Sequence, residues 1–304
     1  MILLTGASGY IGSAVYARLK RQGIPTLTAG RRSCDRFLDL NHCDGLSELF
    51  FDITVVIHCG GIAHNKGNAS SYRVANVEAC EVLAAAAETA GVKQFIFLSS
   101  LNVVPADKSD PGTPALDLPK PRSLYAQSKW RAEIQLSKVL RTSQCQLVIL
   151  RPALVYDQAL TANLAALKKW QGRLRVSLPA TGQRSLVARP DLVALIVSLL
   201  RGEGADDAGS NYTSCDQVLA VTDGQCYSAF RIARALAVTA PFKLPAPLWR
   251  AILVCLAKLP LPQTQALAAS IGGHYWCGET AQPFDGAKWS LEHLLSVTKS
   301  ESTT

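Results

Sequence analysis

The chain has 304 residues, of which 48% are hydrophobic and 18% charged, a composition that supplies a sizeable core and excludes a globally disordered protein. Lys and Arg outnumber Asp and Glu by 31 to 23, which gives a formal net charge of +8. No run of Lys or Arg exceeds two residues and no repeat alternates basic with aromatic side chains, so the pattern is not typical of a nucleic-acid-binding protein.

The nine cysteines are an odd number, and none of them forms a Cys-x-x-Cys pair. We therefore expect neither a zinc site nor a disulfide framework, and interpret them as buried free thiols in a reducing cytoplasm. His58, His64 and His274 show no metal-ligand spacing, so no metal is predicted. The chain reaches a glycine turn at residue 6, too early for a signal peptide, and no apolar stretch approaches the roughly 20 residues of a membrane span.

Strand and helix signals alternate through the first half of the chain. Short apolar runs predict strands at residues 1–5, 25–30, 53–61, 93–100 and 145–156. Apolar residues at helical spacing predict helices at residues 10–23, 69–91 and 124–143. Alternation at this rhythm predicts an α/β fold, a Rossmann-type doubly wound parallel sheet.

The pattern loosens after residue 157. Residues 105–122 are rich in proline and charge and are interpreted as a loop, and further helices are predicted near residues 161–170, 190–204, 228–238 and 245–260. We expect a nucleotide-binding domain of residues 1–156 plus about 184–214. A smaller C-terminal α/β substrate lobe is expected to hold residues 157–183 plus about 215–304.

A glycine motif follows the first predicted strand. The stretch TGASGYIG places Gly6, Gly9 and Gly12 at intervals of three residues before a predicted helix. Glycines there allow a tight turn and a close approach of the backbone to a pyrophosphate, and the helix N-terminus directs N–H groups at the anion. Because a strand precedes the motif and a helix follows it, the motif predicts a dinucleotide site that includes Tyr10 and Ile11.

Three polar side chains indicate proton-transfer chemistry. Tyr125 and Lys129 in YAQSK are four residues apart and share one face of a predicted helix. The ammonium group is expected to favour the phenolate and to bring the pKa of Tyr125 toward the working pH. Ser100 ends the predicted strand FIFLSS, at the sheet edge where ligands bind, and its hydroxyl can donate to a carbonyl or alkoxide oxygen. Ser100, Tyr125 and Lys129 are therefore the predicted catalytic residues.

Together these motifs resemble those of the extended short-chain dehydrogenase/reductases, in particular the nucleotide-sugar epimerases, dehydratases and ketoreductases. The resemblance covers nearly the whole chain and implies a homodimer formed through the helices near residues 72–90 and 125–141. Beyond Tyr125 and Lys129, it implies cofactor contacts at Asp39, Leu40, Cys59, Gly60, Gly61, Ser99, Pro152 and Leu154. It implies substrate contacts at Ser100, Asn102, Asn163 and Arg184, and a bracing role for Asn76 beneath the central helix.

The residues after Ser100 help to distinguish between the reactions that this resemblance implies. The 4,6-dehydratases carry Thr-Asp-Glu there, because elimination of water needs an additional acid and base. This chain has Ser100, Leu101 and Asn102 instead, and neither of the last two can do that proton transfer. A dehydratase is therefore not expected. Further departures, such as Gly60 and Gly61 in place of alanines, affect the substrate geometry more than the cofactor site.

The stretch TLTAGRRSC, residues 26–34, bears on the choice of cofactor. In this fold an acidic residue about 20 positions after the glycine motif binds the ribose 2′-hydroxyl of NAD. Here that place holds Arg31 and Arg32, whose charges suit the 2′-phosphate of NADP. The alternatives are that both arginines are surface charges and that Asp35 serves an NAD ribose. We expect NADP(H), with NAD(H) possible.

A ketoreductase consumes NADPH and releases NADP, whereas a 4-epimerase returns the hydride to the sugar and keeps its NAD. The expected preference for NADP(H) therefore favours a reductase. The sequence most resembles bacterial reductases of UDP-4-keto-6-deoxy-N-acetylhexosamines, so we expect NADPH-dependent reduction of the 4-keto group of a UDP-linked sugar for surface polysaccharide synthesis. An NAD-dependent UDP-hexose 4-epimerase is the alternative, and a non-catalytic nucleotide sensor is a remote one. Trp249, Ile252, Leu253 and Leu256 could form a face for a membrane surface, although packing inside the substrate lobe explains them better.

Overall fold

A computed structural model describes residues 1–43, 45–63, 67–106, 110–159, 164–165, 167–168, 176–202, 217–236, 242–261, 264–265, 268, 271–273, 275–277 and 288–301. Contacts between Cα atoms divide the chain into two compact units. The first unit holds Met1–Pro105, Asp110–Pro152 and Leu192–Val221, and the second holds Ala106–Ser109, Ala153–Asp191 and Thr222–Thr304. No helix in the described part of the chain combines the length and the apolar character needed to cross a membrane.

The first unit is built on a parallel sheet of seven strands in the order β3-β2-β1-β4-β5-β6-β9. The strands span Ile2–Thr5 (β1), Thr26–Gly30 (β2), Arg36–Phe37 (β3), Val55–His58 (β4), Gln94–Leu98 (β5), Gln146–Pro152 (β6) and Gln217–Val221 (β9). Ile2, Val55, Gln94 and Gln146 lie in one row across the sheet. The strand order reverses between β1 and β4, which is where ligands bind at the carboxyl edge of such sheets.

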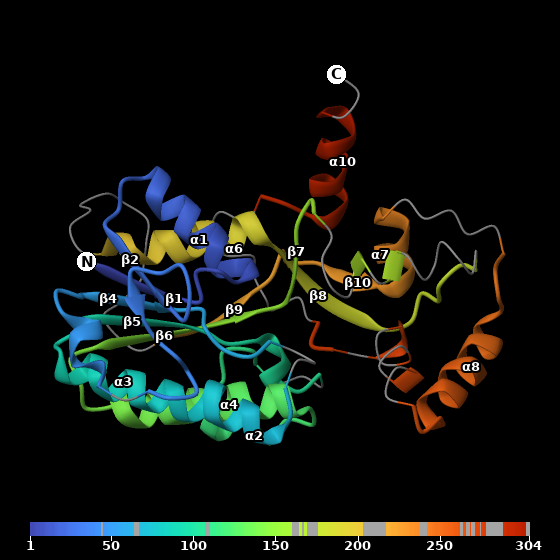
Figure 1. The fold of residues 1–304 in the computed structure, drawn as a ribbon. Helices are drawn as coiled ribbons and strands as arrows, with labels where there is room; N and C mark the ends of the chain where they lie inside the picture. Colours follow the sequence, from blue (N-terminus) through green and yellow to red (C-terminus); the bar gives the residue numbers. More distant parts are fainter. Residues whose placement is uncertain are drawn as a thin grey trace. The chain divides into compact units, whose positions relative to one another are not determined.

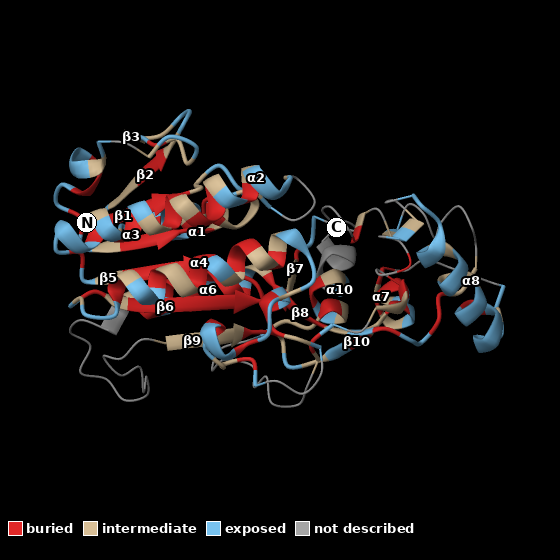
Figure 2. Ribbon diagram, turned by 90° about the horizontal axis from the view of Figure 1, so that it is seen from below, coloured by how far each residue is buried: buried red, intermediate tan, exposed pale blue. Residues whose placement is uncertain are grey.

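Helices cover both faces of this sheet. Figure 1 shows α1 (Tyr10–Arg21) and α6 (Arg189–Ser198) on one face, and α3 (Ala79–Thr89) and α4 (Leu124–Leu140) on the other. The strands β1, β4, β5 and β6 are consequently buried between two layers (Figure 2). Leu83, Phe95 and Leu136 are fully buried in the core beneath α3 and α4. Burial on both faces explains why the strands appear in the sequence as unbroken apolar runs.

Short helical turns complete the first unit. They are η1 (Leu46–Phe50), α2 (Ala69–Tyr72), the π-helical η2 (Arg73–Glu78), η3 (Leu101–Val103), η4 (Ala115–Asp117) and η5 (Leu199–Gly202). The predicted helix at 69–91 is thus a continuous α2–η2–α3 run whose middle turn is widened to a π-helix. Asn68 starts this run with a capping box, because its side chain accepts from the Ser71 N–H while the Ser71 side chain accepts from the Asn68 N–H.

The second unit contains a three-stranded sheet in the order β10-β8-β7. Its elements are β7 (Leu154–Tyr156), β8 (Gln183–Ala188), β10 (Cys226–Ser228), α7 (Ala229–Ala235), α8 (Ala246–Lys258) and α10 (Leu291–Glu301). Tyr156, Leu186, Tyr227 and Leu291 pack in one apolar cluster of this unit. The predicted strand 145–156 therefore divides after Pro152, because its two parts pair with different sheets.

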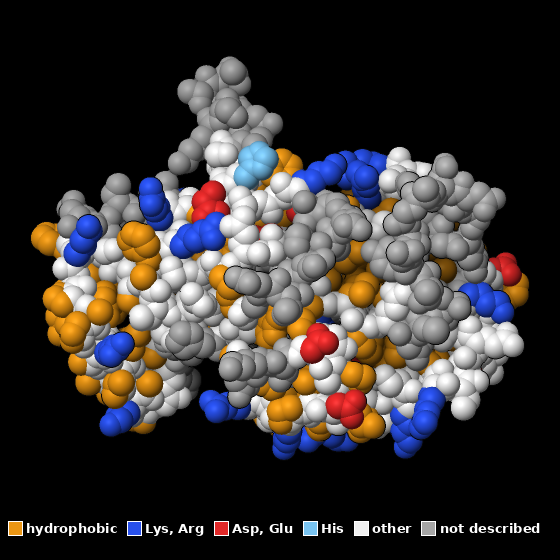
Figure 3. Space-filling view, turned by 180° about the vertical axis from the view of Figure 1, so that it is seen from behind, with side chains coloured by type: hydrophobic (Ala, Val, Ile, Leu, Met, Phe, Trp, Pro, Cys, Tyr) orange, Lys and Arg blue, Asp and Glu red, His pale blue; other side chains and the backbone are white. Residues whose placement is uncertain are grey.

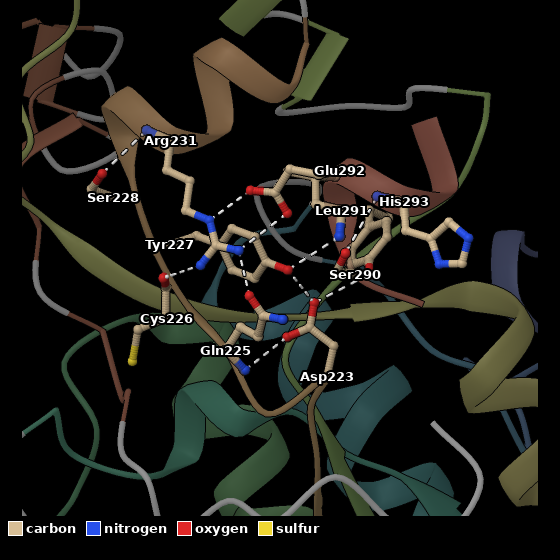
Figure 4. Close-up of polar contacts among 11 residues, drawn as sticks. Asp223, Gln225, Cys226, Tyr227, Ser228, Arg231, Ser290, Leu291, Glu292 and His293 are labelled. Atoms are coloured by element: carbon tan, nitrogen blue, oxygen red, sulfur yellow. Dashed lines mark hydrogen bonds and ion pairs between the residues drawn. The ribbon is translucent and has the colours of Figure 1, made fainter. Parts of the chain in front are cut away.

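A polar network holds the start of α10 in the second unit (Figure 4). The hydroxyls of Tyr227 and Tyr156 donate to Asp223 Oδ2 at 2.7 and 3.1 Å. Tyr227 in turn accepts from the Leu291 N–H at 3.1 Å. Burial of the Asp223 carboxyl raises its pKa to about 6, against the lowering effect of these hydrogen bonds. Asp223 is thus a titratable anchor between β10 and α10.

The unit boundaries differ from the predicted domains at two strands. Residues 184–191 were expected in the nucleotide-binding domain, but β8 pairs with β7 and β10 of the second unit. Residues 217–221 were expected in the substrate lobe, but β9 pairs with β6 and extends the seven-stranded sheet. Both differences arise because strand partners distant in sequence, and not sequence neighbours, decide which unit a strand joins.

The prediction that all cysteines are free thiols is wrong for two of them. Cys226 and Cys277 form a disulfide. Cys226 lies in β10, which pairs with β8. The segment Tyr275–Trp276, just before Cys277, forms backbone hydrogen bonds with Gln183 and Ser185 of β8. Strand β8 therefore brings the two cysteines together. Cys80 and Cys145 are buried and form no disulfide, as expected, whereas Cys255 is exposed. Cys215 lies outside the described residues.

Candidate active site

The glycine motif forms a tight turn between β1 and α1. Gly6 has a φ of +72°, a left-handed conformation that favours glycine, and its carbonyl accepts from the Gly9 N–H at 2.9 Å. A Cβ on Gly12 would lie 2.2 Å from the Gly6 oxygen, and a Cβ on Gly6 would lie 2.7 Å from the backbone of Cys59 and Gly60. Only hydrogen atoms fit at these positions. The turn therefore brings the N-terminus of α1, where Tyr10 and Ile11 begin the helix, to the carboxyl edge of the sheet.

The end of β4 lies against this turn. Cys59, Gly60 and Gly61 follow His58, and Gly61 has a φ of +131° with its Cα against the Asn76 side chain. His58 received no role from the sequence, yet it is fully buried and lies 2.6 Å from the Thr5 hydroxyl through Nδ1. Burial lowers the pKa of His58 to about 3, with a smaller contribution from Lys129, so the imidazole is neutral. It is a structural residue that joins β1 to β4 beneath the glycine turn.

The end of β2 carries exposed positive charge. Arg31 and Arg32 follow Gly30 directly, and both side chains are exposed. The Asp35 carboxylate accepts from the backbone N–H and the hydroxyl of Thr28, both at 2.8 Å. These hydrogen bonds lower the pKa of Asp35, which is consequently a charged brace for the turn after β2. In this structure the Asp35 carboxylate is therefore engaged in hydrogen bonds with Thr28 of β2.

Asp39 and Leu40 follow β3 at the same sheet edge. The Asp39 carboxylate accepts from the Asn41 backbone and side-chain amides, both at 3.0 Å, and these bonds lower its pKa, with a smaller contribution from Arg31. Leu40 packs partly buried against the core, with its side chain facing Gly60. Of these two predicted cofactor contacts, Asp39 therefore lies close enough to Arg31 to interact with its charge.

Ser100 and Tyr125 are brought together by β5 and α4. Ser100 follows the end of β5 and caps η3, where its Oγ accepts from the Asn102 N–H at 3.2 Å. Tyr125 lies in the first turn of α4, which Ser123 caps through the Ala126 N–H. A hydrogen bond joins the side chains of Ser100 and Tyr125. The two predicted catalytic hydroxyls thus share one place, while the Asn102 side chain is exposed.

The expectation that Lys129 lowers the pKa of Tyr125 is wrong in this structure. Burial raises the pKa of Tyr125 to about 12, and the hydrogen bond from Ser100 opposes that shift only in part. Lys129 is itself buried one turn further along α4. Its Nζ donates to the Leu98 carbonyl at 2.9 Å and lies 4.6 Å from the centroid of the Phe97 ring. Burial lowers the pKa of Lys129. The phenol is protonated at neutral pH, as an ordinary tyrosine with a pKa near 10 also is.

The residue Asn76 braces α4, as the resemblance implied. Its side-chain oxygen accepts from the Ile62 N–H at 2.7 Å, and its amide donates to the Ile62 carbonyl and to Ser128 Oγ, both at 3.0 Å. Ser128 donates to the Tyr125 carbonyl at 2.7 Å. The π-helical turn η2 carries Asn76, and such widened turns are often found at functional sites. The chain of bonds fixes the loop after β4 relative to Tyr125.

Ser99 is directed away from the sheet edge into a buried ion pair. Its hydroxyl bonds to Glu133, and Glu133 forms a two-fold salt bridge with Arg151 through Nε and NH2. Both charged side chains are fully buried. Arg151 also donates to the carbonyls of Pro111 and Thr113 at 2.8 and 2.7 Å, which holds the proline-rich loop. The pair is not predictable from the sequence, because neither residue stands in a motif that marks its partner.

The remaining predicted residues are divided between the two units. Pro152 ends β6 in the first unit, and Leu154 begins β7 in the second. Arg184 lies in β8 of the second unit, where its guanidinium stands 4.8 Å from the Tyr275 ring centroid. Burial lowers the pKa of Arg184, which Tyr275 partly offsets. Asn163 is outside the described residues.

The comparisons with known proteins agree with this geometry. Residues 2–212 match the family described as NAD dependent epimerase/dehydratase. The chain belongs to this family.

Relatives of this epimerase/dehydratase family extend the likeness beyond the matched range. A UDP-glucose 4-epimerase of Vibrio cholerae is 30% identical over 270 residues, which cover 82% of this chain and 79% of the relative. A short-chain dehydrogenase/reductase superfamily protein of Agrobacterium tumefaciens with bound NAD shares the fold at a TM-score of 0.70 and 19% identity, over 100% of this chain and 97% of that one. A UDP-glucose 4-epimerase of Thermotoga maritima, solved with UDP-glucose, has a TM-score of 0.66 at 19% identity and 99% coverage of both chains. The predicted Rossmann-type fold is confirmed.

The residues of this family member fit a nicotinamide dinucleotide. The glycine turn is a cradle that a Cβ at Gly6 or Gly12 would fill, and the first turn of α1 carries no acidic residue to repel a pyrophosphate. The switch in strand order lies beside it, between β1 and β4. Among the described residues, no group of three or more His, Cys, Asp or Glu side chains could hold a metal ion.

Proposed function

We propose that the chain is an NADPH-dependent reductase of the 4-keto group of a UDP-linked 6-deoxy sugar, of the kind used in surface polysaccharides. The observation that carries this proposal is the end of β2, where Arg31 and Arg32 are exposed and the carboxylate of Asp35 is bonded to Thr28. An arginine pair there favours a 2′-phosphate, because a guanidinium donates two parallel hydrogen bonds to phosphate oxygens. A 2′-hydroxyl would instead be served by a carboxylate at that place.

Tyr125 is placed to act as the proton donor of the proposed reduction. The nicotinamide, when bound, supplies hydride to the C4 carbon. Tyr125, whose pKa is raised to about 12, gives its proton to the carbonyl oxygen as the alkoxide develops. Ser100 shares a hydrogen bond with Tyr125 and stabilises the charge on the same oxygen. Asn76 and Ser128 position Tyr125 through its carbonyl, and Lys129 is proposed to hold the nicotinamide ribose.

The substrate class rests on the relatives and on single residues. UDP-sugar enzymes are prominent among the relatives, which supports a UDP-sugar as the ligand of the second unit. We propose that Arg184, held by the Tyr275 ring, donates to the diphosphate and that Asn163 contacts the same nucleotide. Leu101 and Asn102 provide no acid or base for elimination, which is the reason to prefer reduction over dehydration.

A UDP-hexose 4-epimerase that retains NAD is the second candidate. One observation favours it, namely the 30% identity with the Vibrio cholerae UDP-glucose 4-epimerase over most of both chains. Epimerisation uses the same Ser100, Tyr125 and Lys129 first for oxidation and then for reduction. The two candidates differ in whether the cofactor is consumed, so cofactor binding separates them.

The test is a fluorescence titration of the purified protein with NADPH and NADH, after acid extraction has determined which nucleotide co-purifies. We expect tight NADPH binding, a clear preference over NADH and little bound nucleotide. The double variant Arg31→Gln/Arg32→Gln is expected to lose the preference, because each charge-assisted hydrogen bond contributes roughly 1.5–3 kcal/mol. Arg36→Gln is a control in the same region, since Arg36 instead donates to the Leu49 and Phe51 carbonyls. Retained NAD with equal affinity for both nucleotides would give the lead to the epimerase.

A further inference from the structure

The helix α8 is apolar on the side that faces the second unit. Trp249 is buried and its indole N–H donates to the Ser177 carbonyl at 3.1 Å. Ile252 and Leu253 pack partly buried against the same cluster, which includes Leu178 and Ile271. This face is therefore occupied by the unit itself, in agreement with the interpretation of these residues as packing.

The opposite side of α8 is apolar as well, and it is exposed. Leu248 is 47% exposed and Val254 is 52% exposed. Leu248, Ala251 and Cys255 follow one another at helical spacing, and all three are exposed. The apolar exposure continues beyond the helix, with Leu261 at 55%. A soluble helix normally places polar side chains on its outward face, so α8 departs from that pattern.

The described residues 242–261 carry positive charge and no negative charge. Residues 224–278 contain five Lys and Arg residues and no Asp or Glu. Three of the five, Lys243, Arg250 and Lys258, are exposed on or beside α8. Figure 3 shows apolar side chains gathered at the left, where α8 lies, with Lys and Arg side chains between them. We call residues 242–261 the α8 surface.

We propose that the α8 surface binds an anionic phospholipid bilayer, with α8 lying in the plane of the interface. The apolar outward side chains enter the headgroup boundary, and the three cations contact lipid phosphates. At 13 residues α8 is about 20 Å long, too short to cross a bilayer but suited to lying on one.

Charge selects this occupant over the others. A second copy of the chain would bring the same cationic surface against this one, and like charges would oppose that contact. An acidic protein could match the charge, but it would also have to match the outward apolar side chains in shape. A bilayer requires only a mixed apolar and cationic surface, which is what residues 242–261 offer. The proposal is independent of the proposed reductase function, because none of its residues belongs to the candidate active site.

The test is co-sedimentation of the full-length protein with vesicles of phosphatidylglycerol and phosphatidylethanolamine, compared with vesicles of phosphatidylcholine. We expect sedimentation with the anionic vesicles only. Removing one cation from an anionic membrane contact lowers partitioning about fivefold, so Lys243→Gln/Arg250→Gln/Lys258→Gln is expected to lose roughly a hundredfold. Val254→Glu/Leu261→Glu removes the apolar part and is expected to lose at least about tenfold. Phe51→Glu changes an apolar residue of the first unit that is even more exposed, at 70%, and is the control.

A second readout locates the contact. An environment-sensitive fluorophore on the exposed thiol of Cys255 is expected to shift to the blue when anionic vesicles are added, and Cys255→Ser reports the signal of any other thiol. Absence of sedimentation at low salt would overturn the proposal. So would sedimentation that Val254→Glu/Leu261→Glu leaves unchanged, because the contact would then lie elsewhere. A dimer in sedimentation velocity that the same variant dissociates would assign the surface to a second copy instead.

Discussion

The close packing of the glycine turn makes Gly12→Ala the most direct test of the cofactor site. The new Cβ would lie 2.2 Å from the Gly6 oxygen and 2.8 Å from the Gly6 carbon, both backbone atoms that cannot rotate away. A normal contact between carbon and oxygen is more than 3 Å, so α1 must move by about 1 Å relative to β1. Overpacking of this kind costs roughly 1–3 kcal/mol of folding stability.

The same movement displaces the N–H groups that would bind the pyrophosphate. Loss of one hydrogen bond to a charged group costs about 1.5–3 kcal/mol, which corresponds to roughly 10- to 150-fold weaker binding. The assays are thermal unfolding without nucleotide and a fluorescence titration with NADPH and NADH. Gly112→Ala is the matched control, because its Cβ would meet its nearest neighbour, Asp110 Oδ1, at 3.4 Å. A Gly12→Ala protein with normal stability and normal nucleotide affinity would refute the reasoning.

Three other outcomes are expected. Tyr125→Phe should reduce turnover by roughly 10²- to 10⁴-fold while nucleotide binding persists, and full activity in a steady-state assay would exclude Tyr125 as the proton donor. Glu133→Ala leaves Arg151 as a buried unpaired charge and should cost about 3–5 kcal/mol in denaturant unfolding, whereas Glu78→Ala in the exposed Arg73 pair should cost at most about 1 kcal/mol. Burial raises the pKa of Asp223 from 3.8 to about 6, so folding favours the protonated carboxyl. The unfolding free energy of the wild type, relative to that of Asp223→Asn, should therefore fall by about 2–3 kcal/mol as the pH rises from about 4 through 6. A flat difference in unfolding free energy over that range would contradict the assigned burial.

The raised pKa of Tyr125 changes how the pair with Lys129 is understood. The sequence places both on one helix face, which suggests an ammonium that acidifies a phenol. In the structure Lys129 donates to the Leu98 carbonyl and stands over Phe97, while Tyr125 bonds to Ser100. A protonated phenol can donate a proton in a reduction and in the reductive half of an epimerisation alike.

The sequence by itself determined the parallel sheet, the glycine turn and the three catalytic candidates. Each of these depends on residues close together in the chain, namely apolar runs of strand length, glycines at a fixed spacing and a Tyr–Lys pair one helical turn apart. Local backbone geometry decides such features, and it acts over a few residues. For the same reason the epimerase/dehydratase resemblance was visible before any contact was known.

Only the tertiary structure decided the features that join distant residues. The Glu133–Arg151 pair, the Asp35 brace on Thr28 and the assignment of β8 to the second unit all depend on which segments meet. The Cys226–Cys277 disulfide, against the expectation of free thiols, and the second apolar face of α8 belong to the same class. Burial, charge pairing and strand pairing are properties of the packed chain, because the free energy of a side chain depends on neighbours that its own sequence position does not name.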